Sequence, residues 1–484
     1  MSQQLVFRDF HLAGLLPSIN SMSANGLAQM SGCDPLSERG QLCVSPAMLD
    51  SVAANAVIDV TINSILECSN GYMYMFGNSG KIYSSATGSS WSLEHTASPA
   101  AGGTAILCAM EFEGYLYYAT ESRLGRWQIG TAWAGANDNW QTFANTDAFA
   151  HPMIVKFKGL YIGDGRSIHL VDDAGVYSAS ALQIEAAQKI VCFADMERHI
   201  AIGTRTGTIS DPKGQAKVYV WDTYSTNVTS ESLMREPIVS AMGNLDGTIL
   251  IFAGFTGRIY TMSGYTPKLF TRIPHTWSDF PVTQKYLVNQ GSITYRGNTL
   301  YFAPRQFSAG IGTLPLGVYA LGQATPLDPI VLHQPFMPIE ESSQNISACF
   351  SSNDIQFTVA TYGGSKYIYS TNESSGTGSV MKESDFVIRT PRITVQRDVQ
   401  HTISVQIAYS SLSDLWSPYV NIEYTTSLDG TTSEGITLVN DAQRKILYSD
   451  NVVTGICDFQ VVIRTSGSST ASPFNIDAIY ITID

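Results

Sequence analysis

Charged residues are scarce in this chain of 484 residues: they make up 14% of the sequence, where about a quarter is usual. The 28 Lys and Arg residues are scattered, and no basic cluster of the kind that grips nucleic-acid phosphates is present. Long apolar runs are also missing, so the sequence predicts no membrane span. Residues 1–18 lack the charged segment and apolar core of a secretory signal, which favours a protein that folds in the cytoplasm.

Patterned cysteines are absent as well. The seven cysteines are odd in number, widely dispersed and never spaced as CxxC, which argues against a disulfide framework and against a zinc site. Amphipathic helical stretches of a dozen residues are missing between the apolar runs, which argues against a parallel α/β fold. What is abundant instead is Gly, Ser, Thr, Asn and Tyr, a composition typical of β-rich, turn-rich proteins.

A hairpin unit recurs through the middle of the chain. Each copy has an apolar aromatic strand, a turn or loop, and a second strand, and copies follow one another at intervals of about 40 to 55 residues, the period of β-propeller blades. Seven copies occur, beginning with YMYMF, YLYYA, GLYIG, HIAIG, TILIF, TLYFA and IQFTVA. Most are preceded by a short apolar run that would form the inner strand of a blade: TAILCAM, PMIVKF, KIVCFA, PIVSAM, GSITY and NISACF.

These features predict an all-β chain in three parts. Residues 1–54 form an extended N-terminal arm, residues 55–385 a seven-bladed β-propeller with degenerate repeats, and residues 386–484 a β-sandwich. The sandwich is indicated by alternating strands such as HTISVQIAY and IYITID, which carry one apolar face. An open edge strand is a liability in a sheet, and residues 55–63 are the expected strand that closes the ring.

The segment KIYSSATGSSWS resembles the Asp-box of sialidases and related propellers. Ser84, Gly88 and Trp91 stand at the right spacing, but Ala86 occupies the Asp position. The tripeptide at 272–274, which begins with Arg272, resembles the arginine motif of that family but lies in the fifth blade and not at the start. The segment is therefore expected to be a turn after a blade hairpin, with Trp91 packed between neighbouring blades.

No other pattern predicts chemistry. Asp172, Asp173, Asn137 and Asn139 lack calcium-loop spacing and are expected to cap turns. The histidines are isolated, and no GxSxG elbow is present. We therefore expect no catalytic residue, no metal and no cofactor.

The layout resembles a class of phage tail proteins that place a short N-terminal arm, a degenerate propeller and a C-terminal β-sandwich in this order. The segments GCDPLSERGQLCVSP, DGTILIFAGFTGRIYTMSG and GVYALG are similar to phrases of such proteins, and the tail nozzle or tail hub type fits best. This resemblance implies a non-enzymatic virion protein, made in the host cytoplasm and placed in the tail. It also implies a homo-oligomeric ring, commonly sixfold, that contacts other tail proteins and lets DNA pass as cargo.

Two other functions stay open. One is a tail fibre or receptor-binding protein that holds host glycans on exposed Trp and Tyr side chains. The other, less favoured, is a sialidase-like glycan hydrolase. In the nozzle interpretation the arm docks on a neighbouring subunit or tail protein, because its apolar residues have no place in the propeller period. The interface residues expected there are Phe7, Phe10, Leu15 and Leu16.

Overall fold

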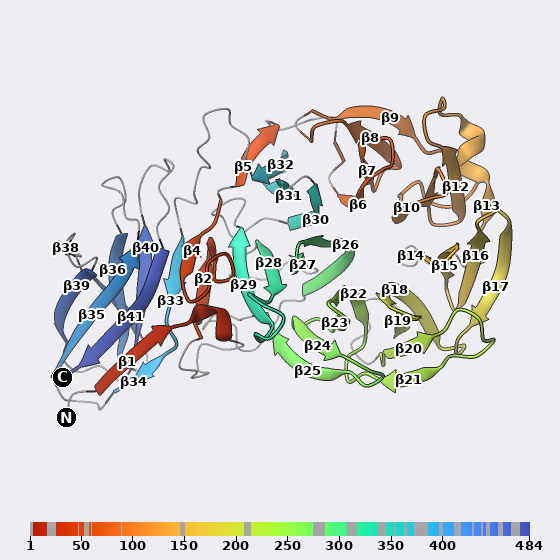
Figure 1. The fold of residues 1–484 in the computed structure, drawn as a ribbon. Helices are drawn as coiled ribbons and strands as arrows, with labels where there is room; N and C mark the ends of the chain where they lie inside the picture. The colour runs from red at the N-terminus through yellow and green to blue at the C-terminus, as the bar shows by residue number, and fades with distance from the viewer. Residues whose placement is uncertain are drawn as a thin grey trace.

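The structure is a computed structural model in which nearly all regular elements are strands (Figure 1). The two short 3-10 helices in its described parts are η1 (Phe10–Leu12) and η2 (Gly135–Asn139). None of the described segments is a helix long and apolar enough to cross a membrane. The structure describes residues 3–16, 26–46, 48–52, 58–59, 61–88, 90–145, 151–207, 214–273, 286–306, 317–336, 345–352, 355–362, 365–371, 386–395, 400–410, 418–427, 430–436, 439–441, 446–453, 458–465 and 475–484.

The described residues form a series of antiparallel strand quartets that follow one another around a ring (Figure 1). Six quartets are separate four-stranded sheets, and one more is the first part of a ten-stranded sheet. This arrangement confirms the expected all-β class and the β-propeller.

The quartets are numbered in chain order, and their strands are as follows: first, β6 (Ile62–Glu67), β7 (Met73–Gly77), β8 (Lys81–Ser85), β9 (Ser92–Thr96); second, β10 (Cys108–Phe112), β11 (Tyr115–Ala119), β12 (Arg123–Gln128), β13 (Gln141–Thr142); third, β14 (Met153–Lys156), β15 (Gly159–Asp164), β16 (Ser167–Asp172), β17 (Tyr177–Gln183); fourth, β18 (Gln188–Met196), β19 (His199–Thr206), β20 (Lys217–Trp221), β21 (Ser230–Leu233); fifth, β22 (Val239–Leu245), β23 (Thr248–Ala253), β24 (Arg258–Met262), β25 (Lys268–Arg272); sixth, β26 (Tyr286–Arg296), β27 (Thr299–Gln306), β28 (Val318–Gly322), β29 (Val331–Phe336); seventh, β30 (Asn345–Ser352), β31 (Ile355–Tyr362), β32 (Ser365–Thr371), β5 (Met48–Val52).

The structure has the inner strands and hairpins at the positions that the apolar runs and turns of the sequence predict. The first strands of quartets two to seven overlap the six apolar runs, and the second and third strands of each quartet overlap the seven predicted hairpins. Gly80 shows why a turn residue is needed: its φ is +82°, and a Cβ there would lie 2.7 Å from the carbonyl oxygen of Thr104. The local pattern therefore sufficed to find these strands.

The expected closing strand at 55–63 is wrong. The last quartet takes its fourth strand from β5, whose residues Met48 to Val52 pair with Ile368 to Thr371 of β32. Within 55–63, the described residues from Ile62 onward belong to β6, the first strand of the first quartet. The last quartet is still completed by a distant part of the chain, as an open edge strand demands, but that strand comes from the arm.

The C-terminal region forms two sheets beside the sixth quartet, and both chain termini lie at their far end (Figure 1). The seven-stranded sheet contains β1 (Gln3–Arg8), β3 (Cys33–Asp34), β4 (Leu42–Val44), β35 (His401–Ser410), β38 (Val439–Asp441), β39 (Ile446–Val453) and β41 (Asn475–Ile483). The ten-stranded sheet continues from β29 through β2 (Gln29–Ser31) to β33 (Val387–Arg389), β34 (Ile393–Thr394), β36 (Pro418–Ser427), β37 (Gly430–Ile436) and β40 (Asp458–Thr465).

The arm is built into this chain's own sheets. β1 pairs antiparallel with β41 from Gln3–Ile483 to Arg8–Ala478, and β2 lies between β29 of the propeller and β33 of the C-terminal region. Alternating apolar residues of β35, β40 and β41 join arm residues and sixth-quartet residues in one hydrophobic cluster. The arm thus links the propeller and the C-terminal sheets into one packed unit.

The four residues expected at an interface are buried inside this chain. The exposed fractions of Phe7, Phe10, Leu15 and Leu16 are 4%, 0%, 5% and 6%. Phe7, Phe10 and Leu15 belong to the cluster shared by the arm, the sixth quartet and the C-terminal sheets, and the Leu15 amide donates to the carbonyl of Leu332. This corrects the expectation that the four side chains dock on a neighbour, because the apolar surface that covers them is intramolecular.

Candidate functional site

A cavity lies at the centre of the ring, among the first strands of the quartets. Its lining comes from the first strands β6, β10, β14, β18, β22 and β26, from Arg305 on β27 and from adjacent loops, and its volume is about 620 Å³. We call this cavity the axial channel. Its size lies in the range of about 300–1,000 Å³ that small-molecule sites occupy, so it is the first place to look for function.

One strand reaches into the channel. In the sixth quartet, Val288 pairs with Pro304 and Ile293 with Phe302, so residues 289–292 are looped out opposite a single partner residue. We call residues 289–292 the axial bulge. The Gln290 side chain binds the backbone of Met242 on β22 twice, accepting from its amide and donating to its carbonyl, both at 2.9 Å.

On its other side the axial bulge meets the first quartet. A Cβ built on Gly291 would lie only 1.8 Å from the carbonyl oxygen of Asn63 on β6. Ser292 holds the bulge in shape by placing its Oγ 2.8 Å from the carbonyl oxygen of Asn289 and 3.1 Å from that of Ala303. The bulge therefore ties β22 to β6 across part of the channel.

The described lining of the axial channel has little charge, and the one permanent charge among its residues is positive. None of the described residues that line it is Asp or Glu, although the whole chain has a net charge of −13. Arg305, near the end of β27, supplies the cation, and burial lowers the pKa of its guanidinium. Cys108 also lines the channel, and burial raises the pKa of its thiol to about 11, which makes it a poor nucleophile.

His151 borders the channel between the second and third quartets. Its side chain is buried, with Nδ1 3.0 Å from the carbonyl oxygen of Gly163 and Nε2 3.0 Å from that of Glu121. Burial lowers the pKa of His151, although both carbonyls and the nearby Asp164 act in the opposite direction. The ring also stacks on Phe143 at 3.8 Å between centroids. His151 thus connects the second and third quartets, and we call this set of contacts the joint.

Asp164 and His169 form a second buried contact beside this joint. His169 Nδ1 accepts a hydrogen bond from the Ser180 amide at 3.1 Å, so the ring proton is on Nε2, which donates to Asp164 at 3.2 Å. Asp164 also accepts from the amides of Ala144 and Asn145. Burial would raise the pKa of Asp164, but these hydrogen bonds, His169 foremost, hold it below the usual value. These hydrogen bonds hold the surrounding chain in place around the carboxylate.

Ion pairs next to a tyrosine recur at the starts of the quartets. In the fifth quartet, Arg258 donates to Glu236, and the Tyr260 hydroxyl donates to the same carboxylate oxygen at 3.2 Å. Glu236 is buried, whereas the Arg258 side chain is 43% exposed. A Cβ on Gly254 would lie 2.1 Å from Glu236, so only glycine leaves room for the carboxylate. We call such an arrangement a strand clasp.

The first quartet contains a second strand clasp. Asp59 is buried and accepts hydrogen bonds from the Ser79 amide at 2.7 Å, the Ser79 hydroxyl at 2.5 Å and the Tyr83 hydroxyl at 3.3 Å. Lys81 places its Nζ 4.0 Å from the carboxylate. Burial, and then the charge of Asp59, raise the pKa of Tyr83.

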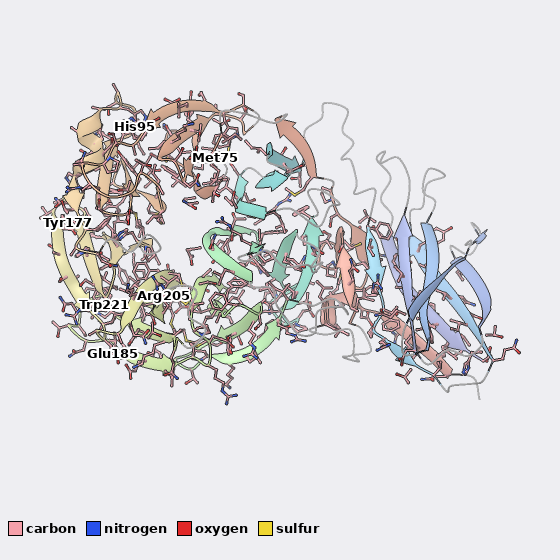
Figure 2. The ribbon with its side chains drawn as sticks, turned by 180° about the vertical axis from the view of Figure 1, so that it is seen from behind. Met75, His95, Tyr177, Glu185, Arg205 and Trp221 are labelled. Carbon is pink, nitrogen blue, oxygen red and sulfur yellow. The ribbon has the colours of Figure 1, made fainter. Side chains whose placement is uncertain are left out.

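The fourth quartet has a more exposed version. Lys217 Nζ lies 2.7 Å from Glu185, and this hydrogen bond raises the pKa of Lys217 and lowers that of Glu185. Tyr219 is buried, and its burial raises its pKa to about 12. Figure 2 shows Glu185 at the rim of the ring. Each clasp fastens the chain that enters a quartet to the third strand of that quartet.

A sequence signal for the strand clasps exists in the third strands of these quartets, although the hairpin pattern alone does not reveal it. Each clasp has a basic residue, a β-branched aliphatic residue and Tyr at 81–83, 217–219 or 258–260. Each acid stands three residues before the first strand of its quartet, as Asp59 does before Ile62 and Glu236 does before Val239. Because the acid, the basic residue and the tyrosine recur at the same places in three quartets, the clasps are a structural feature of the fold.

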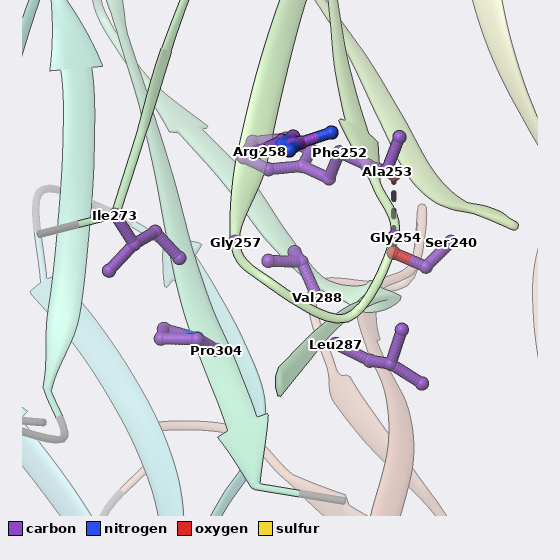
Figure 3. Close-up of a pocket in the computed structure, with 10 residues that line it drawn as sticks. All are labelled: Ser240, Phe252, Ala253, Gly254, Gly257, Arg258, Ile273, Leu287, Val288 and Pro304. Atoms are coloured by element: carbon purple, nitrogen blue, oxygen red, sulfur yellow. Dashed lines mark hydrogen bonds between the residues drawn. The ribbon is translucent and has the colours of Figure 1, made fainter. Parts of the chain in front are cut away.

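A small void lies between one clasp and the axial channel (Figure 3). It has a volume of about 10 Å³ and shares the lining residues Ser240 and Leu287 with the channel. The Ser240 hydroxyl donates to the carbonyl of Phe252 at 3.3 Å (Figure 3). The void is about the size of one water molecule and too small for a ligand.

The segments considered for metal binding cap turns in the structure. Asn137 accepts from the Ala134 amide at 2.8 Å, Asn139 from the Ala100 amide, and Asp172 from the amides of Ala174 and Val176. Asp173 lies 3.6 Å from Lys158 in an exposed ion pair. In the described ranges, no three His, Cys, Asp or Glu side chains gather as a metal site.

The Asp-box-like segment is a turn, as expected. The Trp91 indole donates to the carbonyl of Gly88 at 3.1 Å, and its ring is buried with residues of both the first and the seventh quartets, including Ala348 and Ile368. The predicted packing of Trp91 between neighbouring quartets is thus confirmed. Arg272 lies on β25, the last strand of its quartet, and does not line the axial channel.

Comparisons with known proteins give likenesses of fold alone. No family model matches the chain, and no curated protein matches it. Among solved structures, the RRP9 WD40 repeats are 13% identical, with 68% of this chain and 99% of that chain covered and a TM-score of 0.45. The WD40 β-propeller domain of Doa1 is 10% identical, with 64% and 93% covered and a TM-score of 0.42. A computationally designed protein, Ika8, is 11% identical, with 66% and 99% covered and a TM-score of 0.41.

Proposed function

We propose that this chain is a non-enzymatic structural protein of a phage tail, of the nozzle or hub type. Several copies would assemble as a ring, commonly sixfold, which lets DNA pass and attaches to neighbouring tail proteins. The protein would be made in the host cytoplasm and end in the virion tail. The observation that carries the proposal is β2, which joins propeller strand β29 to C-terminal strand β33 in one continuous sheet. A scaffold needs such a rigid connection between its parts.

The finer architecture belongs to the same proposal. The seven quartets would be the blades of one closed seven-bladed propeller, and the two C-terminal sheets would form a β-sandwich. In support, Ile403, Phe459 and Ile479, from β35, β40 and β41, share one buried cluster, as facing layers of a sandwich do. The boundaries 1–54, 55–385 and 386–484 describe this division along the chain.

DNA would pass through the lumen of the assembled ring and not through one chain. The axial channel of about 620 Å³ is partly crossed by the axial bulge, which leaves no room for a duplex. The net charge of −13 suits a conduit, because carboxylates at its wall would repel DNA phosphates. With Phe7 and Phe10 buried, contacts between copies would use other surfaces of the chain.

The absence of catalysis is part of the proposal. The buried carboxylates Asp59, Asp164 and Glu236 each accept hydrogen bonds from neighbours that position the chain. The described lining of the axial channel offers no carboxylate to act as acid or base. These features suit a scaffold better than a glycan hydrolase.

A tail fibre or receptor-binding role is the second candidate. Phe157 and Tyr224, from turns of adjacent quartets, are 52% and 80% exposed, and their ring centroids lie 6.0 Å apart. Tyr265 of the fifth quartet, 47% exposed, likewise lies beside His199 of the adjacent fourth quartet. Exposed aromatic rings of this kind are suited to stacking on sugars.

The deciding experiment combines size and location. The purified protein is examined by light scattering and negative-stain electron microscopy, and antibodies locate it on the virion. A ring, with label on the tail axis, is the expected result. A monomer that binds host polysaccharide, loses that binding in Tyr224→Ala and sits at fibre tips would establish the second candidate instead. Label on the capsid exterior would exclude both.

A further inference from the structure

Arg305 is placed where a bound anion would meet it. It lines the axial channel near the end of β27, directly across the strand pair from Leu287 on β26. The described structure gives its guanidinium no ion pair or hydrogen bond, while burial lowers its pKa. Arg258, by contrast, has Glu236 as its partner. Arg305 thus has a desolvation cost that no carboxylate of the described residues offsets.

The surroundings of Arg305 are short of negative charge. No Asp or Glu is among the described residues that line the axial channel, in a chain with 41 such residues. A cavity with low-dielectric walls and charge of one sign concentrates ions of the other sign. Against a net charge of −13, this channel is a local exception that favours anions.

The lining also offers polar side chains that remain available to bind a ligand. Asn78 and Asn289 line the channel, and the described structure gives neither side chain a hydrogen-bond partner. By contrast, Gln290 uses both ends of its amide on Met242, and Asn63 donates to the carbonyl of Ile106. Amide N–H groups together with a guanidinium are the donors that phosphate and carboxylate oxygens accept from.

We propose that the axial channel is a binding site for a small oxyanion, a molecule that carries a phosphate or carboxylate group, and that Arg305 is its charged anchor. The cavity of about 620 Å³ accommodates a ligand larger than a single phosphate ion. Such a ligand would sit beside the axial bulge, which joins β22 to β6. Because the ligand would bind the folded chain and not the unfolded one, its binding would stabilise the ring of quartets within one chain. The proposal does not depend on the tail function.

The test uses the full chain and two probes, inorganic phosphate and citrate, followed by isothermal calorimetry and thermal unfolding at constant ionic strength. We expect saturable binding of at least one probe at one site per chain, with a rise in melting temperature. Arg305→Gln should weaken that binding at least tenfold, and Arg305→Lys should weaken it less because the charge remains. Arg166→Gln is the matched control, because Arg166 lies on a turn outside the channel and donates to Gln183.

Absence of saturable binding for both probes, or binding that Arg305→Gln leaves unchanged, would overturn the proposal. If Arg305→Gln does not fold, crystals of the wild-type protein soaked in the tighter probe decide the matter. An anion in contact with Arg305 supports the site, and an anion found elsewhere or nowhere refutes it. Binding of phosphate alone would indicate a phosphate-bearing ligand, and binding of citrate alone a carboxylate.

Discussion

Gly291 on β26 lies against the carbonyl of Asn63 on β6, so that a Cβ at Gly291 would stand 1.8 Å from that oxygen. The two residues belong to the sixth and first quartets, and their contact spans the seventh quartet between them. The contact is backbone to backbone, so no side chain can move aside to relieve a clash. A single glycine therefore determines whether the axial bulge can sit in the channel.

Gly291→Ala should destabilise the protein by about 2–4 kcal/mol, because the added methyl must displace β6 or the bulge. Urea unfolding followed by fluorescence measures the change. Gly264→Ala is the matched control: it has open space around it, and its cost should stay within about 0.5 kcal/mol. Equal effects of the two substitutions would show that the bulge is not packed as described.

Trp91→Ala should cost about 3–5 kcal/mol, since the ring is buried between the first and seventh quartets. Leu93→Ala, on the neighbouring strand β9 and 45% exposed, should cost far less. The free energy of unfolding in urea is the measurement. A small loss for Trp91→Ala would mean that the ring does not close through this contact.

Phe10→Ala should lower the free energy of unfolding by about 3–5 kcal/mol, and the loss should not vary with protein concentration. The reason is that Phe10 is buried by its own chain. Leu12→Ala, in the same 3-10 helix and 40% exposed, serves as the control. A loss that disappears at low protein concentration would restore the arm as a contact between subunits.

The fifth-quartet clasp should respond asymmetrically to removal of its two charges. Arg258→Met leaves the buried Glu236 without its cation and should cost about 1–2 kcal/mol, a value reduced by the solvent around Arg258. Glu236→Gln should cost less, because the amide keeps the contact with Tyr260 and the freed guanidinium is half exposed. A double-mutant cycle in urea measures the coupling, and a larger cost for Glu236→Gln would reverse the argument.

His151 should make stability depend on pH below about 6.5. Burial holds its pKa in the folded protein below 6.5, the ordinary value, so the unfolded chain takes up a proton that the folded protein does not. The contribution of neutral His151 to the free energy of unfolding is complete above pH 6.5. It is lost as the pH falls toward the pKa of His151 in the folded protein. Asp164 and His169 are the ionisable groups beside it.

Urea unfolding between pH 5 and 8 checks this prediction. Wild type should lose more stability with falling pH than His151→Gln does. His199→Gln should behave like wild type, because His199 lies at the start of β19, beside Tyr265 and away from the joint. Parallel pH profiles for wild type and His151→Gln would show that His151 does not carry the effect.

The sequence by itself determined the local structure. Strand and turn residues at a regular interval revealed the hairpins and the inner strands, because both depend on neighbours a few residues apart. The spacing of Gly88 and Trp91 likewise placed the turn and the inter-quartet packing of the indole. The presence of Ala86 where the Asp-box has Asp could likewise be read from the sequence alone.

Only the tertiary structure decided which distant segments meet. The closing strand proved to be β5 and not residues 55–63, because short apolar strands carry no mark of their partner. Phe7 is paired with Ile479 of β41, which lies more than 400 residues further along the chain, and Phe10 lies in the same buried cluster. Arg305 gave no local signal either: its isolation in the axial channel arises from six strands that bring no described carboxylate with them.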